Sequence, residues 1–212
     1  MLYLNNPRAI EARSRAIIAA RLGDCGLRGG EREIVIRMVH ATGDPEYARL
    51  VVVHPRLVET ATAALRRGAD VITDVEMVRQ GISSRKLARG GGRIICAIRD
   101  RKVAEVAAER GITKAMAAME YLAPRMTGAI VTIGNAPTAL FRLLELMAAG
   151  HAAPAAVIGT PVGFVGAAEA KEALERSGVP FVTVRGTRGG STVAAAAVNA
   201  LLHLTWAEEG EG

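Results

Sequence analysis

Aromatic residues are scarce in this chain: Phe, Tyr and Trp make up 3% of its 212 residues. Surfaces that bind nucleic acids by stacking bases need exposed aromatic side chains, so the composition argues against that function. The net charge is +6, but the basic residues are scattered in short groups such as Arg66-Arg67 and Arg85-Lys86, without a basic run. We expect no nucleic-acid partner. Dispersed arginines can instead converge around a small molecule with several negative charges.

Cysteine is equally rare, with two residues, Cys25 and Cys96. Two cysteines do not make a disulfide framework. Cys96 lies in the apolar run 94–98 and is expected to fill the core. The sequence contains no Cys-x-x-Cys and no His-Glu-x-x-His motif, so we expect no metal site.

No stretch of the chain is both long and apolar enough to cross a bilayer. Residues 193–204 are mostly apolar but too few, and we interpret them as part of a buried helix. The opening residues, Met-Leu-Tyr-Leu-Asn-Asn, lack the apolar centre of a secretory signal. We therefore expect a cytoplasmic protein without a membrane partner.

Small apolar residues, in contrast, are abundant. Hydrophobic residues make up 50% of the chain, most of them Ala and Val, which suits helices packed closely on a sheet. Nearly continuous apolar runs are typical of strands that are buried on both faces. Such runs lie at 71–73, 94–98, 129–133, 156–159 and 181–184. Helical patterns lie at about 100–110, 114–123, 136–149, 166–177 and 191–205.

This alternation predicts a single α/β domain over residues 1–212. The predicted fold is a three-layer α/β/α sandwich around a mainly parallel sheet of about five strands. Residues 49–53 are a candidate for a further short strand, and 208–212 are expected to be frayed. Two helices are expected before the sheet, at about 8–22 and 31–40, the second ending near Gly43.

A ligand is expected at the loops that follow the strands, because open parallel sheets bind ligands at the carboxyl ends of their strands. Several of these loops carry glycines and lead into helices, whose first backbone N–H groups can hold carboxylates or phosphates. None of them matches a dinucleotide fingerprint or a P-loop. The candidate binding residues in these loops are Asp74, Gly134, Asn135, Gly163, Arg185 and Gly186.

His40 is the candidate for proton chemistry. It lies in the last turn of the helix predicted at 31–40, where the helix end favours a protonated imidazole. Histidine suits such a role because its charge changes near neutral pH. A single histidine on a helix is more often structural, and we interpret His54, His151 and His203 in that way. His40 differs from them by its position beside a glycine loop.

Five segments occur in the order found in one known family. Together they extend the match over nearly the whole chain. The chain thereby resembles the precorrin-8X methylmutase (precorrin isomerase) family, which includes the cobalt-precorrin-8 methylmutases. The segments are Met38-Val-His-Ala-Thr-Gly-Asp44, Thr73-Asp-Val-Glu-Met-Val78 with Gly81, Ile133-Gly-Asn-Ala-Pro-Thr-Ala-Leu140, Pro161-Val-Gly-Phe-Val-Gly-Ala-Ala-Glu169 and Arg185-Gly-Thr-Arg-Gly-Gly-Ser191.

The resemblance implies an isomerase of vitamin B12 biosynthesis with an α/β/α fold. Members move a methyl group from C-11 to C-12 of the tetrapyrrole precorrin-8X, which gives hydrogenobyrinic acid, and they use no cofactor. They are homodimers with the site near the dimer interface. The histidine of the family's His-Ala-x-Gly motif is catalytic and falls on His40, which would donate a proton or a hydrogen bond to the ring.

The resemblance also implies substrate contacts outside the strand loops. The family's Ile-Glu-x-x-Ser motif matches Ile10 to Ser14 and makes Arg13 and Ser14 candidates. Thr42 follows the catalytic histidine in the same motif. Lys114 stands where the family has an arginine, and it would bind a carboxylate as a point charge rather than as a fork.

The residues alone agree with this chemistry. A broad ring that carries many carboxylates suits a basic protein with N–H-rich loops, and small apolar residues suit the faces of the ring. A methyl shift along a conjugated system needs no redox partner or metal. It needs the electrons of the ring to be drawn in one direction, which a proton or a strong hydrogen bond can do.

Several alternatives remain open. The same rearrangement on cobalt-precorrin-8, giving cobyrinic acid, fits these motifs equally well because the ring would carry the metal. A non-catalytic corrinoid carrier would keep the loops without needing the histidine, and an NAD-type oxidoreductase is suggested only by the sheet.

The weakly charged helices at 114–123 and 191–205 are packed either within the chain or against a partner. The resemblance favours a homodimer, and a hand-over of product to neighbouring corrin-pathway enzymes is a further hypothesis.

Overall fold

A computed structural model describes residues 4–24 and 26–207 of the chain. Cys25 and the tail at 208–212, which was expected to be frayed, lie outside these ranges. Cys96 is a free, half-buried thiol on an edge strand.

Within the described residues, one six-stranded sheet forms the centre of the protein. The strand order is β1-β6-β5-β4-β2-β3, and all neighbours are parallel except β1, which runs antiparallel to β6 at one edge. The inner strands are buried along their whole length, which explains their continuous apolar sequences. The predicted parallel sheet is confirmed, and the segment 49–53 contributes the antiparallel strand. The strands are β1 (Val51–Val53), β2 (Val71–Thr73), β3 (Ile94–Cys96), β4 (Ile130–Ile133), β5 (Ala156–Gly159) and β6 (Phe181–Val184).

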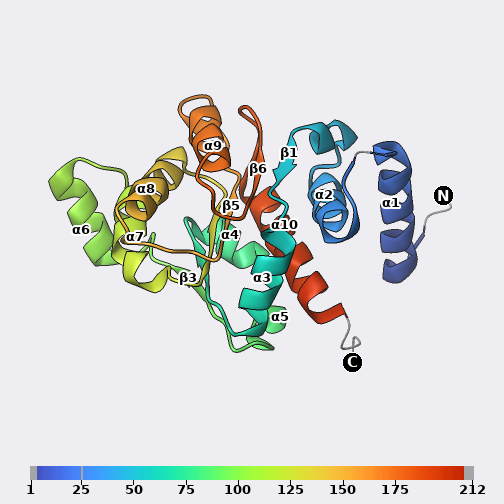
Figure 1. Cartoon of the computed structure of the whole chain (residues 1–212), viewed down its shortest axis with the longest axis horizontal. Coiled ribbons are helices and arrows are strands. Elements are labelled where there is room, and N and C mark those ends of the chain that lie inside the picture. The colour runs from blue at the N-terminus through green and yellow to red at the C-terminus, as the bar shows by residue number, and fades with distance from the viewer. Residues whose placement is uncertain (1–3, 25, 208–212) are drawn as a thin grey trace.

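Helices cover both faces of the sheet, which confirms the predicted three-layer sandwich (Figure 1). Successive side chains of a strand point to opposite faces, so Val71 joins one hydrophobic core and Ile72 joins the other. One layer consists of α6 (Arg101–Arg110), α7 (Lys114–Leu122), α8 (Pro137–Ala148) and α9 (Ala167–Glu175), with the short η2 (Ala123–Arg125) after α7. The other layer consists of α3 (Leu57–Arg66), α4 (Glu76–Gly81), α5 (Ser84–Ala88) and α10 (Ser191–Trp206).

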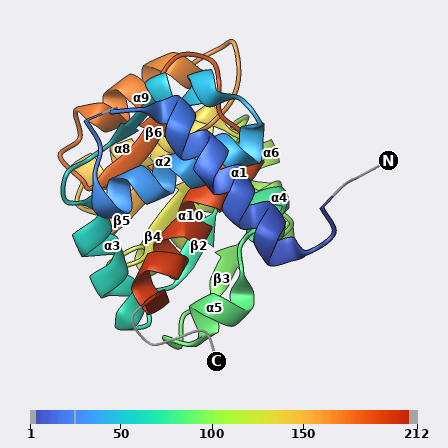
Figure 2. The ribbon, with the colours of Figure 1, turned by 90° about the vertical axis from the view of Figure 1, so that its right-hand side faces the viewer.

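Two further helices lie outside the second layer. The α2 helix (Gly29–Thr42) packs on α10, and α1 (Pro7–Leu22) packs on α2 and on the short η1 (Pro45–Arg49). Figure 2 shows α1 in front, with α2 behind it and α10 behind α2. Because α10 is covered from both sides, it is buried nearly all round, as its apolar sequence requires. Its apolar surface is therefore satisfied by packing within one chain.

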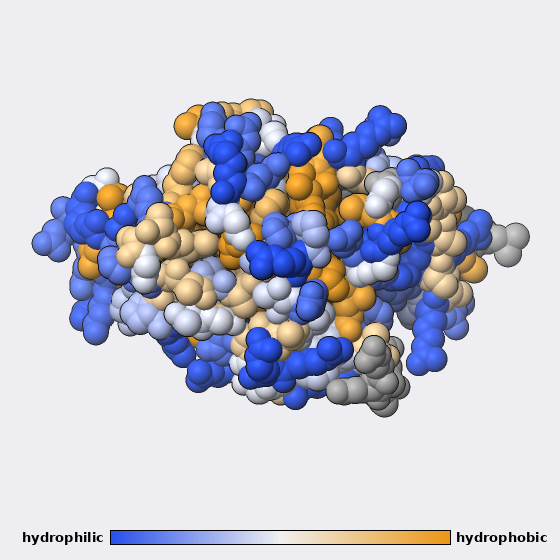
Figure 3. Space-filling view, viewed as in Figure 1, coloured by the Kyte–Doolittle hydropathy of each residue, from blue (hydrophilic) through white to orange (hydrophobic). Residues whose placement is uncertain are grey.

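The surface is mostly polar. Figure 3 shows hydrophilic side chains over both ends of the face seen in Figure 1, with apolar side chains grouped toward its middle. Over residues 4–24 and 26–207, no helix has both the length and the apolar character that a membrane span needs.

Candidate active site

A pocket of about 580 Å³ opens between α2, α4, α5 and α10. This volume lies within the range of small-molecule sites. The lining combines an imidazole, two basic side chains and hydroxyl groups with an apolar floor of alanines. The polar lining residues discussed below are His40, Arg37, Lys86, Ser83, Ser191, Thr192 and Asn199.

His40 lies in the last turn of α2, on the side that faces the pocket. Its neighbours Met38 and Val39 are buried, so the helical spacing turns His40 outward, where its side chain is exposed. The helix ends at Gly43, which adopts a left-handed φ of 68° and donates its N–H to the Val39 carbonyl at 2.9 Å. The imidazole therefore stands at the C-terminal end of α2, beside the pocket.

The start of α10 supplies further polar groups to the pocket. Ser191 and Thr192 open the helix, and the N-cap residue Gly190 has no side chain that could cap the first N–H groups. Uncapped N–H groups at a helix start can hold an anion. This end of the pocket is therefore suited to a carboxylate.

Small residues bring α4 close to α10 on the other side of the pocket. A Cβ atom on Gly81 would lie 2.7 Å from the Cβ of Ala195, so any larger residue would push the two helices apart. Asn199 of α10 then fixes the turn between α4 and α5. It accepts the Ser83 N–H at 2.9 Å and donates to the Gly81 carbonyl at 2.8 Å.

Arg37 and Lys86 make the pocket positive. Arg37 lies one turn before His40 on the same face of α2. One of its nitrogens is 2.9 Å from the Glu11 carboxylate of α1, and its buried Nε has no hydrogen-bond partner among the described residues. Lys86 approaches from α5. The arrangement can bind ligand carboxylates next to an imidazole that can donate a proton.

Asp74 organises the loop after β4. Its side chain is fully buried and accepts the N–H groups of Gly134, Asn135 and Ala136 at 3.1, 2.9 and 2.9 Å. Burial raises the pKa of Asp74, and the three N–H groups oppose that shift because they stabilise the carboxylate. Asp74 therefore positions this loop, and its contact with a substrate stays a prediction. Asn135 is exposed at the edge of the sheet.

Two of the glycine loops at the carboxyl edge of the sheet are bonded to each other. Gly163 donates its N–H to the Thr187 carbonyl at 3.1 Å, and Gly190 donates to the Thr160 carbonyl at 2.8 Å. Gly186 adopts a left-handed φ of 73° two residues after the end of β6, in the loop that also carries Thr187 and Gly190. Among the described residues, no group of three or more His, Cys, Asp or Glu side chains could hold a metal ion at this edge or elsewhere.

Comparison with known proteins identifies the family. The model of the family described as precorrin-8X methylmutase matches residues 9–204. The chain belongs to the precorrin-8X methylmutase family. It is 46% identical over 201 residues to a precorrin-8X methylmutase of Sinorhizobium sp., and the match covers 94% of this chain and 95% of that protein.

Relatives named for the metal-free substrate and for the cobalt-containing substrate are similar to this chain at nearly equal sequence identity. The chain is 45% identical over 198 residues to a cobalt-precorrin-8 methylmutase of Methanothermobacter thermautotrophicus, with 92% of each protein covered. A solved precorrin-8X methylmutase structure from Thermus thermophilus superposes with a TM-score of 0.87 at 37% identity, covering 96% of this chain and 98% of that one. The predicted family and α/β fold are thus confirmed.

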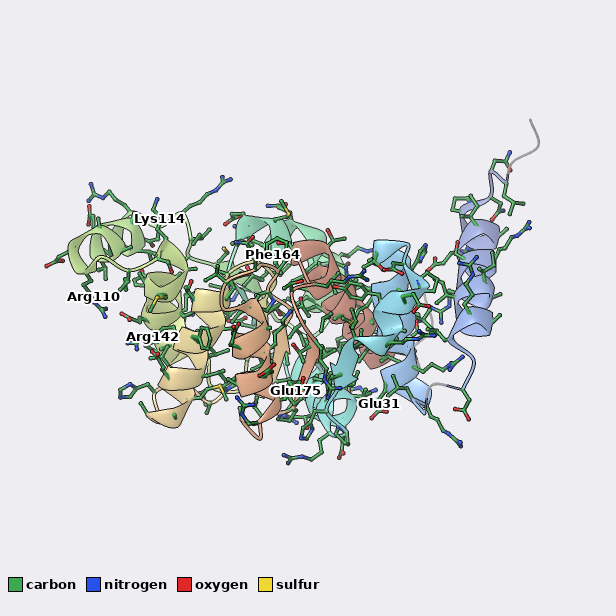
Figure 4. All side chains as sticks on the ribbon, turned by 90° about the horizontal axis from the view of Figure 1, so that it is seen from above. Glu31, Arg110, Lys114, Arg142, Phe164 and Glu175 are labelled. Carbon is green, nitrogen blue, oxygen red and sulfur yellow. The ribbon has the colours of Figure 1, made fainter. Side chains whose placement is uncertain are left out.

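The structure separates the family-derived site residues in space. All of them are described, and His40 is the one that lines the pocket. Thr42 lies at the end of α2, where its hydroxyl donates to the Val39 carbonyl at 3.0 Å. Arg13 and Ser14 lie on α1, beyond α2. Lys114 begins α7, and Figure 4 shows it at the end of the molecule opposite to α1 and α2.

Arg185 also differs from its predicted arrangement. Its guanidinium makes two hydrogen bonds to the Glu175 carboxylate, at 3.2 and 3.1 Å. This ion pair raises the pKa of Arg185. Glu175 is the last residue of α9, whereas the loop with Phe164 leads into the start of that helix (Figure 4). The Arg185 side chain therefore points away from the glycine loops.

The sequence reasoning missed most of the polar lining of the pocket. Arg37 was detectable, because it lies three residues before His40 on one helix. Lys86 was not, because the five-residue helix that carries it leaves no periodic pattern. Thr192 and Asn199 lie in a stretch of the sequence that is otherwise apolar, and their role depends on which side of α10 faces the pocket.

Proposed function

We propose that this protein is an isomerase of corrin biosynthesis, which moves a methyl group from C-11 to C-12 of precorrin-8X. The observation that carries the proposal is the position of His40 in a pocket that also holds Arg37, Lys86 and the uncapped start of α10. A polycarboxylate ring requires this combination of anion-binding groups and one proton donor. Lys114 and Arg185 lie outside this pocket, and Arg185 is paired with Glu175, so the proposal does not place either side chain against a ring bound there.

His40 would act as the acid. The imidazolium donates its proton, or a strong hydrogen bond, to the conjugated ring, which draws electrons away from C-11 and lowers the energy of the delocalised transition state. The bond between the methyl group and C-11 breaks as the bond to C-12 forms, and the proton then returns to His40. No electron leaves the substrate, so the reaction is balanced without a cofactor.

The substrate is either the metal-free ring or its cobalt form, because the two curated relatives named above differ in this respect at nearly equal identity. Purified protein should be incubated separately with precorrin-8X and cobalt-precorrin-8, and the absorption spectrum of the corrin product followed. We expect conversion of at least one. Tight binding of product without conversion of either substrate would instead mean a corrinoid carrier.

The working form would be a cytoplasmic homodimer that passes its product to the next corrin-pathway enzyme. The pocket is open to solvent, and α1 projects at one end of the chain (Figure 1). Ile10 and Ile17 are 42% and 47% exposed on α1, and helical spacing puts Ser14 on the same face. In a homodimer this face would reach the pocket of the second chain, which would bring Arg13 and Ser14 to the substrate.

A further inference from the structure

Lys171 is a buried cation that the proposed reaction does not use. It lies on α9 with 1% of its surface exposed, and its ammonium group donates to the Arg188 carbonyl at 2.7 Å. Among the described residues, no carboxylate lies within ion-pair distance of it. Burying an ammonium group without a counter-charge is costly, so a compensating role is expected.

The carbonyl that Lys171 binds belongs to the loop between β6 and α10. This loop is packed against the loop after β5 so tightly that a Cβ atom on Gly189 would clash with the carbonyl oxygens of Thr160 and Pro161. The bonds from Gly190 to Thr160 and from Gly163 to Thr187, described above, join the same two loops. Lys171 thus binds a loop that two backbone hydrogen bonds already join to the loop after β5, and α10 starts directly after this loop.

The Arg188 side chain extends from this loop to the turn that follows α2. Its Nη1 is 2.7 Å from Oδ2 of Asp44, which follows the end of α2. The other carboxylate oxygen of Asp44 accepts the Glu46 N–H at 3.0 Å, and the Asp44 N–H donates to the Thr42 hydroxyl at 3.2 Å. The ion pair is therefore anchored to the last turn of α2.

We propose that Lys171, Arg188 and Asp44 are positioning residues, which hold the His40 end of α2 at a fixed separation from the start of α10. Lys171 fixes the backbone of Arg188, and Arg188 fixes Asp44. The two pocket walls come from segments far apart in the sequence, and these two bonds join the loop before α10 to the turn after α2. The inference rests on the proposed function of the His40 pocket and adds residues that set its geometry.

The test compares Lys171→Met, Arg188→Gln, Asp44→Asn and the double variant Asp44→Asn/Arg188→Gln in steady-state turnover of whichever of the two substrates the wild type converts. We expect kcat to fall about 10–100-fold in each single variant, because a small misplacement of an acid is costly, with KM nearly unchanged. The double variant should be no slower than the slower of its singles, because both remove one bond. Arg101→Gln breaks an exposed pair with Glu105 on α6 and serves as the matched control, with unchanged kcat.

Amide hydrogen exchange provides a readout that needs no substrate. Lys171→Met should exchange about tenfold faster at the amides of Gly163, Gly190, 42–44 and 46–47, and at the wild-type rate on α6. Faster exchange with wild-type kcat would overturn the proposal, since Lys171 would then be merely structural. Wild-type exchange rates together with a wild-type kcat would overturn the proposal as well. If the wild-type protein converts neither substrate, the proposed function fails. Unchanged exchange in Lys171→Met would then also overturn the positioning role of Lys171, Arg188 and Asp44.

If Lys171→Met does not fold, the variants of the exposed Arg188–Asp44 pair test the proposal on their own. Its side chains are 53% and 37% exposed, so its loss should leave the fold intact. Wild-type kcat in both Arg188→Gln and Asp44→Asn would refute the positioning role.

Discussion

Asp74 is a buried carboxylate whose partners are three backbone N–H groups rather than a basic side chain. The sequence predicted its position at the carboxyl end of a strand, and predicted a substrate contact without the bonds to the loop. The rule for parallel sheets gives the edge at which a side chain lies and does not give its direction. Here the side chain turns inward, because the loop after β4 needs acceptors for its N–H groups.

Removing this carboxylate should therefore act on stability first. We expect Asp74→Ala to lower the free energy of unfolding by about 2–4 kcal/mol, since buried N–H groups lose their acceptor. Asp74→Asn keeps one acceptor oxygen and should cost less than Asp74→Ala. Urea unfolding measures both. An alanine variant as stable as wild type would show that the loop does not depend on this side chain.

We expect the buried Lys171 to make the free energy of unfolding depend on pH. Burial lowers its pKa from 10.5 to about 8. Between these values the unfolded chain binds one more proton than the folded protein, so the free energy of unfolding rises with pH across this window. Below pH 8 both states hold the proton, and the cost of the buried charge is fully present.

The measurement is urea unfolding at pH 7 and pH 9.5 for wild type and Lys171→Met. The wild type should gain about 1–3 kcal/mol relative to the variant over this interval. Lys102→Met removes an exposed lysine of α6 and should show no such change. A pH-independent difference between wild type and Lys171→Met would contradict the assignment.

Among the secondary structure elements, length is one factor in what a sequence reveals, and the 10-residue α3 was not among the predicted helices although the 9-residue α7 and α9 were. The helices α8 and α10, with 12 and 16 residues, carry enough periodic positions to be predicted within a residue or two. The helices α4 and α5, with 6 and 5 residues, do not, and they were missed. These two helices form one wall of the pocket. The sequence therefore predicted His40 but not most of the residues around it.

Close contact between α4 and α10 is the element-scale feature that shapes this wall. We expect Gly81→Ala to cost about 1–3 kcal/mol in the free energy of unfolding, since the added methyl group would overlap Ala195. Adding Ala195→Gly removes that methyl group, so the double variant should be less destabilised than the sum of the two single changes. Gln80→Ala, exposed on the same helix, is the control. Strict additivity of the two changes would mean that the helices do not touch there.

For the molecule as a whole, the outer position of α1 bears on assembly. If α1 forms the homodimer contact, Ile17→Glu should produce monomers and lower activity, because a charge would be buried against a second chain. Ala12→Glu, on the opposite side of α1, should remain dimeric. Sedimentation velocity at micromolar concentration separates these outcomes. A wild-type protein that is monomeric and fully active would refute the dimer.

The role of His40 in this pocket is tested most directly by the turnover of His40→Ala. The variant should fold and bind the corrinoid product as tightly as wild type, because the anion-binding groups remain. Its kcat for methyl transfer should fall at least about 100-fold, the lower end of what a general acid contributes. Wild-type turnover in a folded His40→Ala protein would contradict the account.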